Sequence, residues 1–298
     1  MNDNSRLRHF PAKLLLFGEY TVLSGSRALA VPLQTWSGAL VYRDTRDEQL
    51  AAFTTYLEEM AIFDSAQILA FRRAVADGLH FQSDIPQGYG VGSSGALCAA
   101  IYDQFFHPEQ ETDVRQIREA LAGMEGFFHG QSSGMDPLVT YSGAPVLRES
   151  GQYQILAAKP LQNGLVVFLI DSQTARSTGA LVERYLKMQS EEAFARQCLR
   201  PLMQSVDHAI SFYLDAYLPM LWEHLQVISQ LQFQYFGQMI HDTVSGIWEK
   251  SLSRQDLVIK LCGAGGGGYY LGFARDEEVW EQVSRTSQLK LIRVLHHQ

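Results

Sequence analysis

The chain has 298 residues, of which 46% are hydrophobic and 19% are charged. This balance is typical of a folded globular protein and argues against a disordered one. Asp and Glu outnumber Lys and Arg by 32 to 24. Because no run of basic residues interrupts this acidic excess, we do not expect nucleic acid as a partner. At this length, two packed subdomains are a reasonable expectation.

No segment predicts a membrane span or a secretory leader. The aliphatic and aromatic stretch at residues 165–170 is far shorter than the roughly 20 residues of a membrane-spanning helix. The first ten residues, MNDNSRLRHF, have no apolar signal core. Cys98, Cys198 and Cys262 are an odd number without CxxC spacing, which argues against a disulfide framework or a zinc site. We therefore expect a cytoplasmic protein.

The first 85 residues predict strands on either side of a helical region. Residues 12–22 are typical of a buried strand, with a sharp turn or bulge expected at Gly18. Residues 28–42 continue as a strand, whereas residues 44–76 have helical spacing. Residues 79–85 alternate between apolar and polar side chains, as a half-exposed strand does.

A glycine-rich loop follows, with the sequence PQGYGVGSSGAL at residues 86–97. Three glycines allow its backbone amides to turn toward an anion: Gly88, Gly90 and Gly92. A helix beginning at Ser93 and Ser94 would add the positive end of its dipole. An isolated glycine loop is as often a surface turn, and a serine at a helix start is commonly only a cap. The combination of strand, loop and helix favours a phosphate site.

The rest of the chain predicts helices and a second set of strands. Helices are expected at residues 94–106 and 114–129, and a mainly helical region at residues 180–251. Strands are expected at residues 164–171, on both sides of a glycine loop within residues 258–273, and near residues 289–295. We place the domain boundary at Lys159-Pro160, giving domains of residues 1–158 and 159–298. Helices covering a mixed sheet in each half make an α+β fold.

The second glycine cluster lies in KLCGAGGGGYYLGF, at residues 260–273. A flexible hairpin tip is the plain alternative. Five glycines within six residues carry a large entropic cost on folding, and apolar strands flank them on both sides. This pattern favours a backbone that closely approaches a substrate or a phosphate.

Polar residues near these loops are candidates for the chemistry. Glu125 and His129 lie one helical turn apart, although such a pair is more often a surface contact than a metal site. Asp136 precedes a proline, which alone indicates only a turn. Lys13 lies at the edge of an apolar strand, where a lysine usually extends to solvent. If Lys13 reached Asp136 in a cleft, it would keep that carboxylate ionised and help to neutralise a moving phosphoryl group.

Together these motifs resemble the GHMP kinases, the family of galactokinase, homoserine kinase, mevalonate kinase and phosphomevalonate kinase. PAKLLLFGEYTVLSG, PQGYGVGSSGA and KLCGAGGGG resemble its three motifs in the family's order, over nearly the whole chain. EGFFHGQSSGMD and DSQTARSTGALV are most similar to mevalonate kinases. Tyr20, in the sequence GEY, stands where mevalonate kinases usually have His and is more typical of phosphomevalonate kinases.

The resemblance implies a two-domain GHMP kinase fold of the α+β class. A βαβ-type, ribosomal-protein-like N-terminal domain and a ferredoxin-like C-terminal domain would enclose the active site in the cleft between them. It implies transfer of phosphate from ATP, with Mg²⁺, to a small molecule, with mevalonate as the expected acceptor and isoprenoid precursors as the product class. Phosphomevalonate, a non-catalytic ligand-binding homologue and a diphosphomevalonate decarboxylase are the alternatives. A homodimer is compatible with the sequence.

The resemblance also implies roles for individual residues. Asp136 would orient or deprotonate the acceptor hydroxyl, with Lys13 as its cationic partner. Ser94 and Glu125 would bind Mg²⁺. The ATP phosphates would be held by the second motif: Gly88, Gly90, Gly92, Ser93, Ser94 and Gly95. The acceptor side would be formed by Glu19, Tyr20, Arg176, Thr178, Gly263, Ala264, Gly265 and Gly266.

Overall fold

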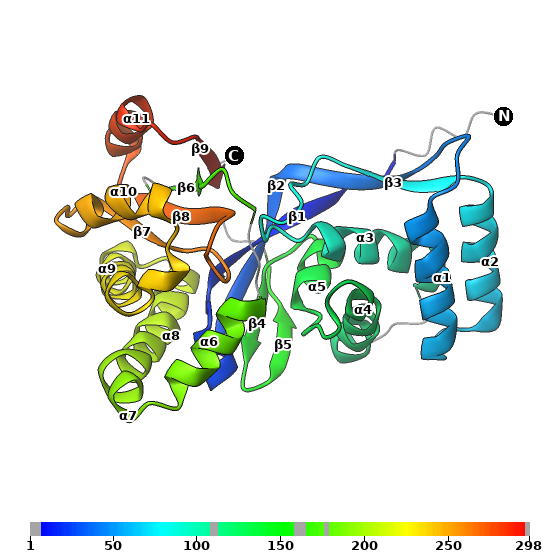
Figure 1. The fold of residues 1–298 in the computed structure, drawn as a ribbon, viewed down its shortest axis with the longest axis horizontal. Helices are drawn as coiled ribbons and strands as arrows, with labels where there is room; N and C mark the ends of the chain where they lie inside the picture. The colour runs from blue at the N-terminus through cyan, green and yellow to red at the C-terminus, as the bar shows by residue number, and fades with distance from the viewer. Residues whose placement is uncertain (1–6, 108–112, 158–164, 176–178, 296–298) are drawn as a thin grey trace.

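The computed structural model describes residues 7–107, 113–157, 165–175 and 179–295. These residues form two β-sheets with helices packed around them, so the predicted α+β class is confirmed (Figure 1). The expectation of mixed sheets is wrong, because every strand pair among the described residues is antiparallel. The proposed boundary at Lys159-Pro160 lies outside the described residues.

The first sheet is built around one long strand, β2. Its strands are β1 (Phe10–Phe17), β2 (Ala28–Tyr42), β3 (Leu79–Ser83), β4 (Val146–Glu149) and β5 (Gln152–Ile155). β1 pairs along β2, while β3 and β4 pair with its two ends, and β5 extends the sheet from β4. The helices of this half are α1 (Glu48–Met60), α2 (Ser65–Ala76), α3 (Ser93–Ile101), α4 (Val114–His129) and α5 (Met135–Ser142). Figure 1 shows α1 and α2 at the end of the molecule away from the second sheet.

The second sheet has the strand order β7-β8-β6-β9. Its strands are β6 (Val166–Asp171), β7 (Leu257–Leu261), β8 (Tyr269–Ala274) and β9 (Leu291–Leu295). The helices of this half are α6 (Gly179–Gln189), α7 (Glu192–Phe194), α8 (Arg200–Leu214), α9 (Leu218–Tyr235), α10 (Asp242–Leu252) and α11 (Glu277–Thr286). Helix α9 is joined to β7 by the Ser229 hydroxyl, which donates to the Ile259 carbonyl at 2.6 Å.

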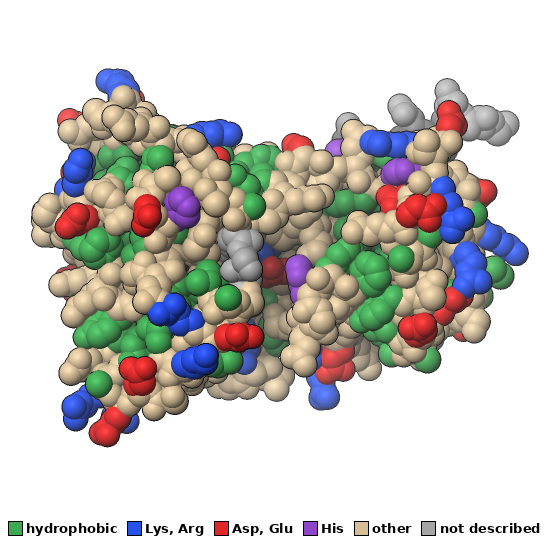
Figure 2. Space-filling model, viewed as in Figure 1, with side chains coloured by type: hydrophobic (Ala, Val, Ile, Leu, Met, Phe, Trp, Pro, Cys, Tyr) green, Lys and Arg blue, Asp and Glu red, His purple; other side chains and the backbone are tan. Residues whose placement is uncertain are grey.

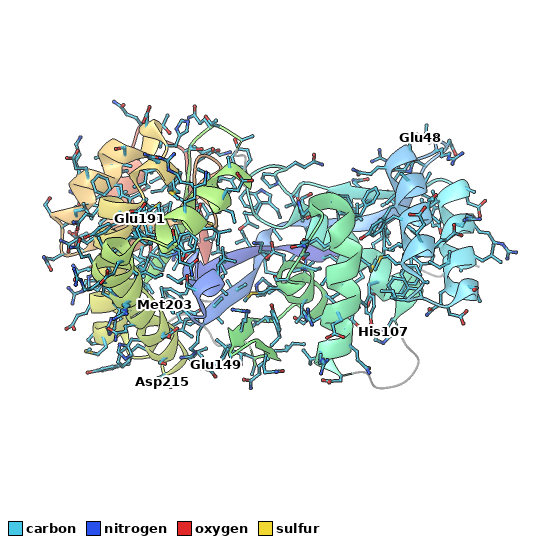
Figure 3. The ribbon with its side chains drawn as sticks, turned by 60° about the horizontal axis from the view of Figure 1, so that its bottom comes forward. Glu48, His107, Glu149, Glu191, Met203 and Asp215 are labelled. Atoms are coloured by element: carbon cyan, nitrogen blue, oxygen red, sulfur yellow. The ribbon has the colours of Figure 1, made fainter. Side chains whose placement is uncertain are left out.

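The two halves meet along β1 and β2. Figure 3 shows Glu48 and His107 in the first half, Glu191, Met203 and Asp215 in the second, and the strands between them. Helix α8 packs against β1 and β2, so the C-terminal half closes over the end of the first sheet. This arrangement brings the end of β1 close to the strands that flank the second glycine cluster.

Several predicted elements have different bounds in the structure. β1 ends at Phe17, because the chain turns at Gly18 with φ +108°, and a Cβ there would lie 2.6 Å from Ala28 Cβ. Residues 44–76 form two helices that begin at the caps Asp47 and Asp64. Helix α5 and the β4–β5 hairpin were not predicted. Both are short elements whose stability comes from packing against the rest of the domain.

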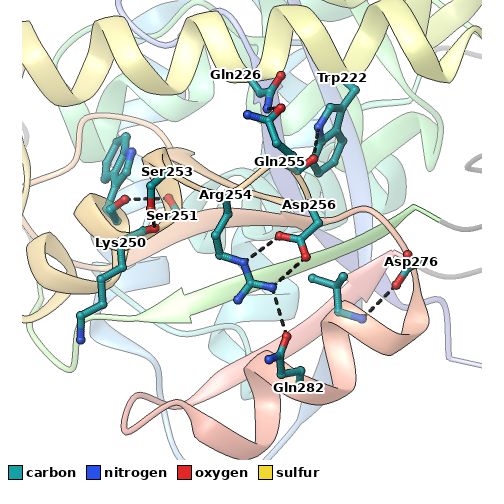
Figure 4. Close-up of polar contacts among 12 residues, drawn as sticks. Trp222, Gln226, Lys250, Ser251, Ser253, Arg254, Gln255, Asp256, Asp276 and Gln282 are labelled. Atoms are coloured by element: carbon teal, nitrogen blue, oxygen red, sulfur yellow. Dashed lines mark hydrogen bonds and ion pairs between the residues drawn. The ribbon is translucent and has the colours of Figure 1, made fainter.

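The connection from α10 to β7 is held by polar contacts at the surface (Figure 4). The Arg254 guanidinium donates to both Asp256 carboxylate oxygens, at 2.7 and 2.9 Å, and to Gln282 at 3.2 Å. The Trp222 indole N–H donates to the Gln255 carbonyl at 3.0 Å. These contacts fix the start of β7, the strand that leads into the second glycine cluster.

Among the residues that the structure describes, no helix has the length and apolar character of a membrane span.

Candidate active site

The first glycine loop lies directly against β1. Gly88, Gly90 and Gly92 have φ values of 75°, 77° and 81°, a left-handed conformation that favours glycine. A Cβ on Gly92 would lie 2.6 Å from Lys13 Cγ. The Lys13 backbone N–H donates to the carbonyl of Val91 at 2.9 Å. Helix α3 begins at Ser93, directly after Gly92. The loop therefore presents a helix N-terminus beside the lysine.

Lys13 and Asp136 form an ion pair, with 2.7 Å between Lys13 Nζ and Asp136 Oδ2. The lysine side chain is only 7% exposed, whereas the aspartate side chain is 36% exposed. The ammonium is thus held in place by protein, and the carboxylate remains accessible to a substrate. Asp136 lies in the first turn of α5, where the helix dipole stabilises a negative charge.

The N-termini of α3 and α5 meet at this ion pair. A Cβ on Gly95 of α3 would lie 3.0 Å from Pro137 N and 3.1 Å from the carbonyl carbon of Asp136. A side chain at Gly95 would require the two helices to separate by a few tenths of an ångström. The closeness of Gly95 therefore sets the distance between the first glycine loop and Asp136.

A second polar group surrounds Glu125 on α4. The Ser94 hydroxyl donates to Glu125 Oε1 at 3.2 Å, and Ser132 donates to Glu125 Oε2. His129 Nε2 lies 2.9 Å from the Ser94 hydroxyl oxygen. Ser132 also accepts from the Gly134 backbone N–H at 2.9 Å, which ties the chain entering α5 to Glu125. Glu125 and Ser94, predicted together from the sequence resemblance, are adjacent in the structure.

Burial first, and the nearby charge of Asp136 second, raise the pKa of Glu125 to about 7, while a hydrogen bond from Ser132 and the charge of Lys13 oppose the shift. A buried carboxylate beside a second one is a place where a cation is favoured. The hydroxyl and carboxylate oxygens of Ser94 and Glu125 are of the kind that Mg²⁺ takes, and they fit such an ion. Among the described residues, no group of three or more His, Cys, Asp or Glu side chains is placed to hold a metal. Mg²⁺ bound with few protein ligands relies on water and substrate phosphates.

The second glycine cluster touches the first loop. Its five glycines, Gly263 and Gly265 to Gly268, all have positive φ. A Cβ on Gly268 would lie 3.0 Å from the Tyr89 carbonyl oxygen, and one on Gly267 would lie 2.7 Å from the Thr174 carbonyl oxygen. Figure 2 shows the surface hollowed between the two halves of the molecule. The two glycine loops are far apart in the sequence, at residues 86–97 and 260–273, and they therefore meet at one site.

Glu19 and Tyr20, predicted to line the acceptor, lie in the interior with 2% and 5% of their surface exposed. Glu19 forms an ion pair with Lys260, and the Tyr20 hydroxyl donates to the Ala264 carbonyl at 2.6 Å. Both side chains thus contact the strand and loop of the second glycine cluster. Arg176 and Thr178 lie outside the described residues.

Three residues that the sequence analysis did not assign to the site are part of it or support it. His129 and Ser132 contact Ser94 and Glu125. The spacing of Glu125 and His129 by one helical turn was a signal, but the same spacing is common on helix surfaces. Lys260 is a lone lysine in the apolar strand LVIKL, and a charge at such a position indicates a buried partner.

Two open cavities lie outside this site, along α6. One of about 390 Å³ is bordered by Glu183, Arg184 and Lys187 among others. The other, of about 370 Å³, extends from Arg184 to Met239. The Met239 carbonyl accepts from the Gly266 N–H at 2.6 Å, so the second cavity lies behind the second glycine cluster. Neither cavity is bordered by Lys13, Asp136 or Glu125, whose contacts define the candidate site.

Residues 52–144, which include the first glycine loop, Ser94, Glu125 and Asp136, match the family model described as "GHMP kinases N terminal domain". This part of the chain is therefore a GHMP kinase N-terminal domain. The chain is 24% identical over 312 residues to the mevalonate kinase of Pyrococcus abyssi (strain GE5 / Orsay), with 90% of this chain and 89% of the relative covered. The family predicted from the motifs is confirmed.

Solved structures show the same fold. The L. major mevalonate kinase in complex with R-mevalonate matches this chain with a TM-score of 0.67 and 17% identity, covering 98% of this chain and 95% of the other. The Streptococcus pneumoniae phosphomevalonate kinase in complex with phosphomevalonate and AMPPNP matches with a TM-score of 0.69 and 16% identity, covering 96% and 99%. At these identities the likeness establishes the fold and leaves the acceptor open.

Proposed function

We propose that this GHMP kinase transfers the terminal phosphoryl group of ATP to the 5-hydroxyl group of mevalonate. The observation that carries the proposal is the ion pair of Lys13 and Asp136, 2.7 Å apart, between the first glycine loop and the N-termini of α3 and α5. An anchored ammonium, an accessible carboxylate and a loop of free backbone amides are the parts that phosphoryl transfer requires. Similarity to a mevalonate kinase over 90% of the chain supports the acceptor.

The first loop and α3 are the proposed binding site for the ATP phosphates. Gly88, Gly90 and Gly92 keep the backbone in conformations that leave N–H groups free for anions, and Ser93 to Gly95 form the first turn of the helix. Ser94 and Glu125 are the proposed Mg²⁺ ligands. When bound, Mg²⁺ would neutralise charge on the transferred phosphoryl group.

Asp136 and Lys13 would act on the acceptor side of the transfer. Asp136 accepts a hydrogen bond from the acceptor hydroxyl and holds its oxygen in line with the γ-phosphorus. The bond from that phosphorus to the β,γ-bridging oxygen breaks, a bond to the hydroxyl oxygen forms, and ADP leaves. The hydroxyl proton passes to Asp136 late in the step and then to solvent. Lys13 keeps Asp136 ionised and stabilises the charge on the moving group.

Phosphomevalonate is the second candidate acceptor, favoured by the sequence GEY at residues 18–20. Both acceptors carry a carboxylate, and they differ at the nucleophile, which is a hydroxyl oxygen in mevalonate and an oxygen of the terminal phosphate in phosphomevalonate. With either acceptor the product would serve isoprenoid precursor synthesis, and we place the enzyme in the cytoplasm. Galactose and homoserine are substrates of other members of the family. In an assay of turnover they serve as comparison acceptors.

A coupled assay of ADP release with Mg-ATP tests the proposal. We expect turnover with mevalonate and much less with phosphomevalonate, galactose or homoserine. The Asp136→Asn variant, purified in the same way, shows whether the release comes from this enzyme and not from a contaminant. Analysis of the product by ³¹P NMR would show a phosphomonoester on the acceptor.

Three outcomes would contradict the assignment to mevalonate. Turnover with phosphomevalonate alone would make the chain a phosphomevalonate kinase. Release of CO₂ with a diphosphorylated acceptor would indicate the decarboxylase of the same family. Binding of acceptor without ADP release, under conditions that support a known kinase, would favour a non-catalytic homologue.

A further inference from the structure

Glu19 and Tyr20 follow the strand that carries Lys13, and they extend from it into the second half of the molecule. After β1, Gly18 turns the chain against Ala28 of β2. Tyr20 has φ +62° and ψ −46°, an unfavourable backbone conformation for a residue with a side chain. A strained conformation of this kind persists where surrounding contacts hold it, which directs attention to the partners of these two residues.

Glu19 is joined to Lys260 of β7 by an ion pair in which both side chains are 0% exposed. The Lys260 ammonium has two further acceptors, the carbonyl of Leu16 in β1 at 3.1 Å and the carbonyl of Leu261 in β7 at 2.8 Å. All three of its N–H groups are thereby used. One ammonium therefore links the end of β1 in the first sheet to β7 in the second.

Tyr20 adds a second link, to Ala264, which lies four residues after Lys260. Its hydroxyl donates to the carbonyl of Ala264, inside the second glycine cluster, at 2.6 Å. Its ring packs against Tyr185 and Phe236, with centroids 4.9 and 5.6 Å away. The four residues Glu19, Tyr20, Lys260 and Ala264, called here the interdomain brace, fix the start of the glycine cluster relative to β1.

The rest of the cluster has little room to move independently of this brace. A Cβ on Gly265 would lie 2.2 Å from the Met239 carbonyl oxygen, and Gly268 lies against the backbone of Tyr89 in the first loop. The Gly268 N–H donates to the Thr174 carbonyl at 2.6 Å. A displacement at Ala264 would thus be passed along the cluster to the loop that we assign to the ATP phosphates.

The energetics of the ion pair argue for a role in position. Removing two charges from water costs free energy that their attraction often fails to repay, and apolar residues of similar size can be as stabilising. Glu19 Oε2 also has no hydrogen-bond partner among the described residues, which adds to the cost. A buried ion pair of this kind adds little to the net free energy of unfolding. Its directional hydrogen bonds, however, specify one arrangement of the two sheets.

We propose that Glu19, Tyr20 and Lys260 are positioning residues that hold the second glycine cluster in register with Lys13 and Asp136. This inference rests on the proposed phosphoryl transfer, and it adds that the transfer depends on a buried link between the two sheets. All three side chains are buried, so we expect them to act through the loop backbone and not by contact with the substrate. Compared with apolar side chains of similar size, the intact pair contributes to the placement of the loop backbone, and therefore to kcat, more than to the net stability of the fold.

The test separates stability from position with a double variant. Lys260→Met alone leaves Glu19 without its counter-ion and should lower Tm. Glu19→Leu combined with Lys260→Met replaces the pair by apolar side chains, and we expect its Tm to return close to that of the wild type. We expect kcat of the double variant to stay at least about tenfold below that of the wild type, because small misplacements of a site have effects of this size.

Two further variants accompany the double variant. Arg254→Met removes a partly exposed ion pair near the start of β7, the strand that contains Lys260, and should leave kcat unchanged. Tyr20→Phe removes one hydroxyl and should lower kcat with little change in Tm. Amide hydrogen exchange provides a readout without turnover: residues 262–268 should exchange faster in the double variant, and not in Arg254→Met.

The outcomes are distinguishable. A double variant that regains both Tm and kcat, or that shows wild-type exchange at residues 262–268, overturns the positioning role. If the wild type transfers no phosphate to any acceptor, the proposed function fails, and the exchange measurement still decides whether the brace orders the glycine cluster. A double variant that unfolds is replaced by Tyr20→Phe, for which unaltered kcat and unaltered exchange also overturn the inference.

Discussion

Two lysine–carboxylate ion pairs among the described residues lie on neighbouring parts of the structure, and they differ in exposure. Lys13 and Asp136 are 7% and 36% exposed, whereas Lys260 and Glu19 are both 0% exposed. The first carboxylate can meet a substrate, and the second cannot. We therefore propose that the pair with an exposed carboxylate takes part in the chemistry, and that the fully buried pair fixes the placement of the strands.

The difference in exposure also predicts opposite responses to mutation. Loss of an accessible carboxylate at a site removes an interaction with the substrate, and solvent can still reach the remaining partner. Loss of one member of a buried pair leaves a charge without water or counter-ion. The first change should mainly affect turnover and the second mainly folding. The predictions below test this contrast.

The largest effect is expected at Asp136. Asp136→Asn keeps the size of the side chain but removes the charge that orients the acceptor hydroxyl, and we expect kcat to fall by about 10²–10⁴-fold. Affinity for Mg-ATP, measured by calorimetry, should change little. Lys13→Met should behave similarly in the ADP-release assay. Turnover equal to that of the wild type in either variant would remove that residue from the mechanism.

The next largest effect is expected on stability, in Lys260→Met. Breaking the buried pair should lower the free energy of unfolding by about 3–5 kcal/mol, measured by urea denaturation. Lys13→Met should lower it less, because the Asp136 carboxylate keeps contact with water. Equal losses in the two variants would show that exposure does not separate the pairs.

The loss in Lys260→Met should depend on pH. Burial raises the pKa of Glu19 above its ordinary value of 4.5, while Lys260 first and Lys13 more weakly oppose the shift. Without Lys260 the folded-state pKa rises further, and the unfolded chain still releases this proton near pH 4.5. Above that pH the folded variant binds more protons than the unfolded chain, so its stability falls as pH rises. The difference from the wild type should be small near pH 4 and larger at pH 8.

A smaller effect is expected where α3 meets α5. Gly95→Ala places a Cβ 3.0 Å from Pro137 N, so the helices must separate by a few tenths of an ångström. We expect a loss of about 1–3 kcal/mol in the free energy of unfolding and a lower kcat, because Asp136 moves with α5. Gly246→Ala is the matched control. Gly246 lies in α10 with nothing within 4 Å of an added Cβ, so this change should raise stability by about 0.5–1 kcal/mol.

The smallest effect is expected at the surface pair of Arg254 and Asp256. Arg254 lowers the pKa of the Asp256 carboxyl by direct hydrogen bonds. A depressed folded-state pKa contributes stability at neutral pH, and this contribution is lost as pH falls through that pKa. Because Asp256 is 38% exposed, Asp256→Asn should lower the free energy of unfolding by less than about 1 kcal/mol at pH 7. A loss as large as that of Lys260→Met would contradict the contrast between buried and exposed pairs.

Local patterns in the sequence were sufficient for most elements and for the family. Residues 28–42 and 114–129 were predicted as a strand and a helix, and β2 and α4 have those bounds. Their periodicity is long enough for one element type to dominate. The two glycine loops were informative about the family because they require backbone conformations that few other residues allow. The roles of individual site residues stay predictions until they are tested.

What only the tertiary structure decided is which polar side chains meet. Glu19 and Lys260 are 241 residues apart, and neither sequence neighbourhood indicates the other. The sequence determined that Lys13, Ser94, Glu125 and Asp136 were available, since their residue types are local facts. Whether a carboxylate faces solvent or the interior depends on how two sheets pack. That packing results from long-range burial of apolar surface, which no short window of residues contains.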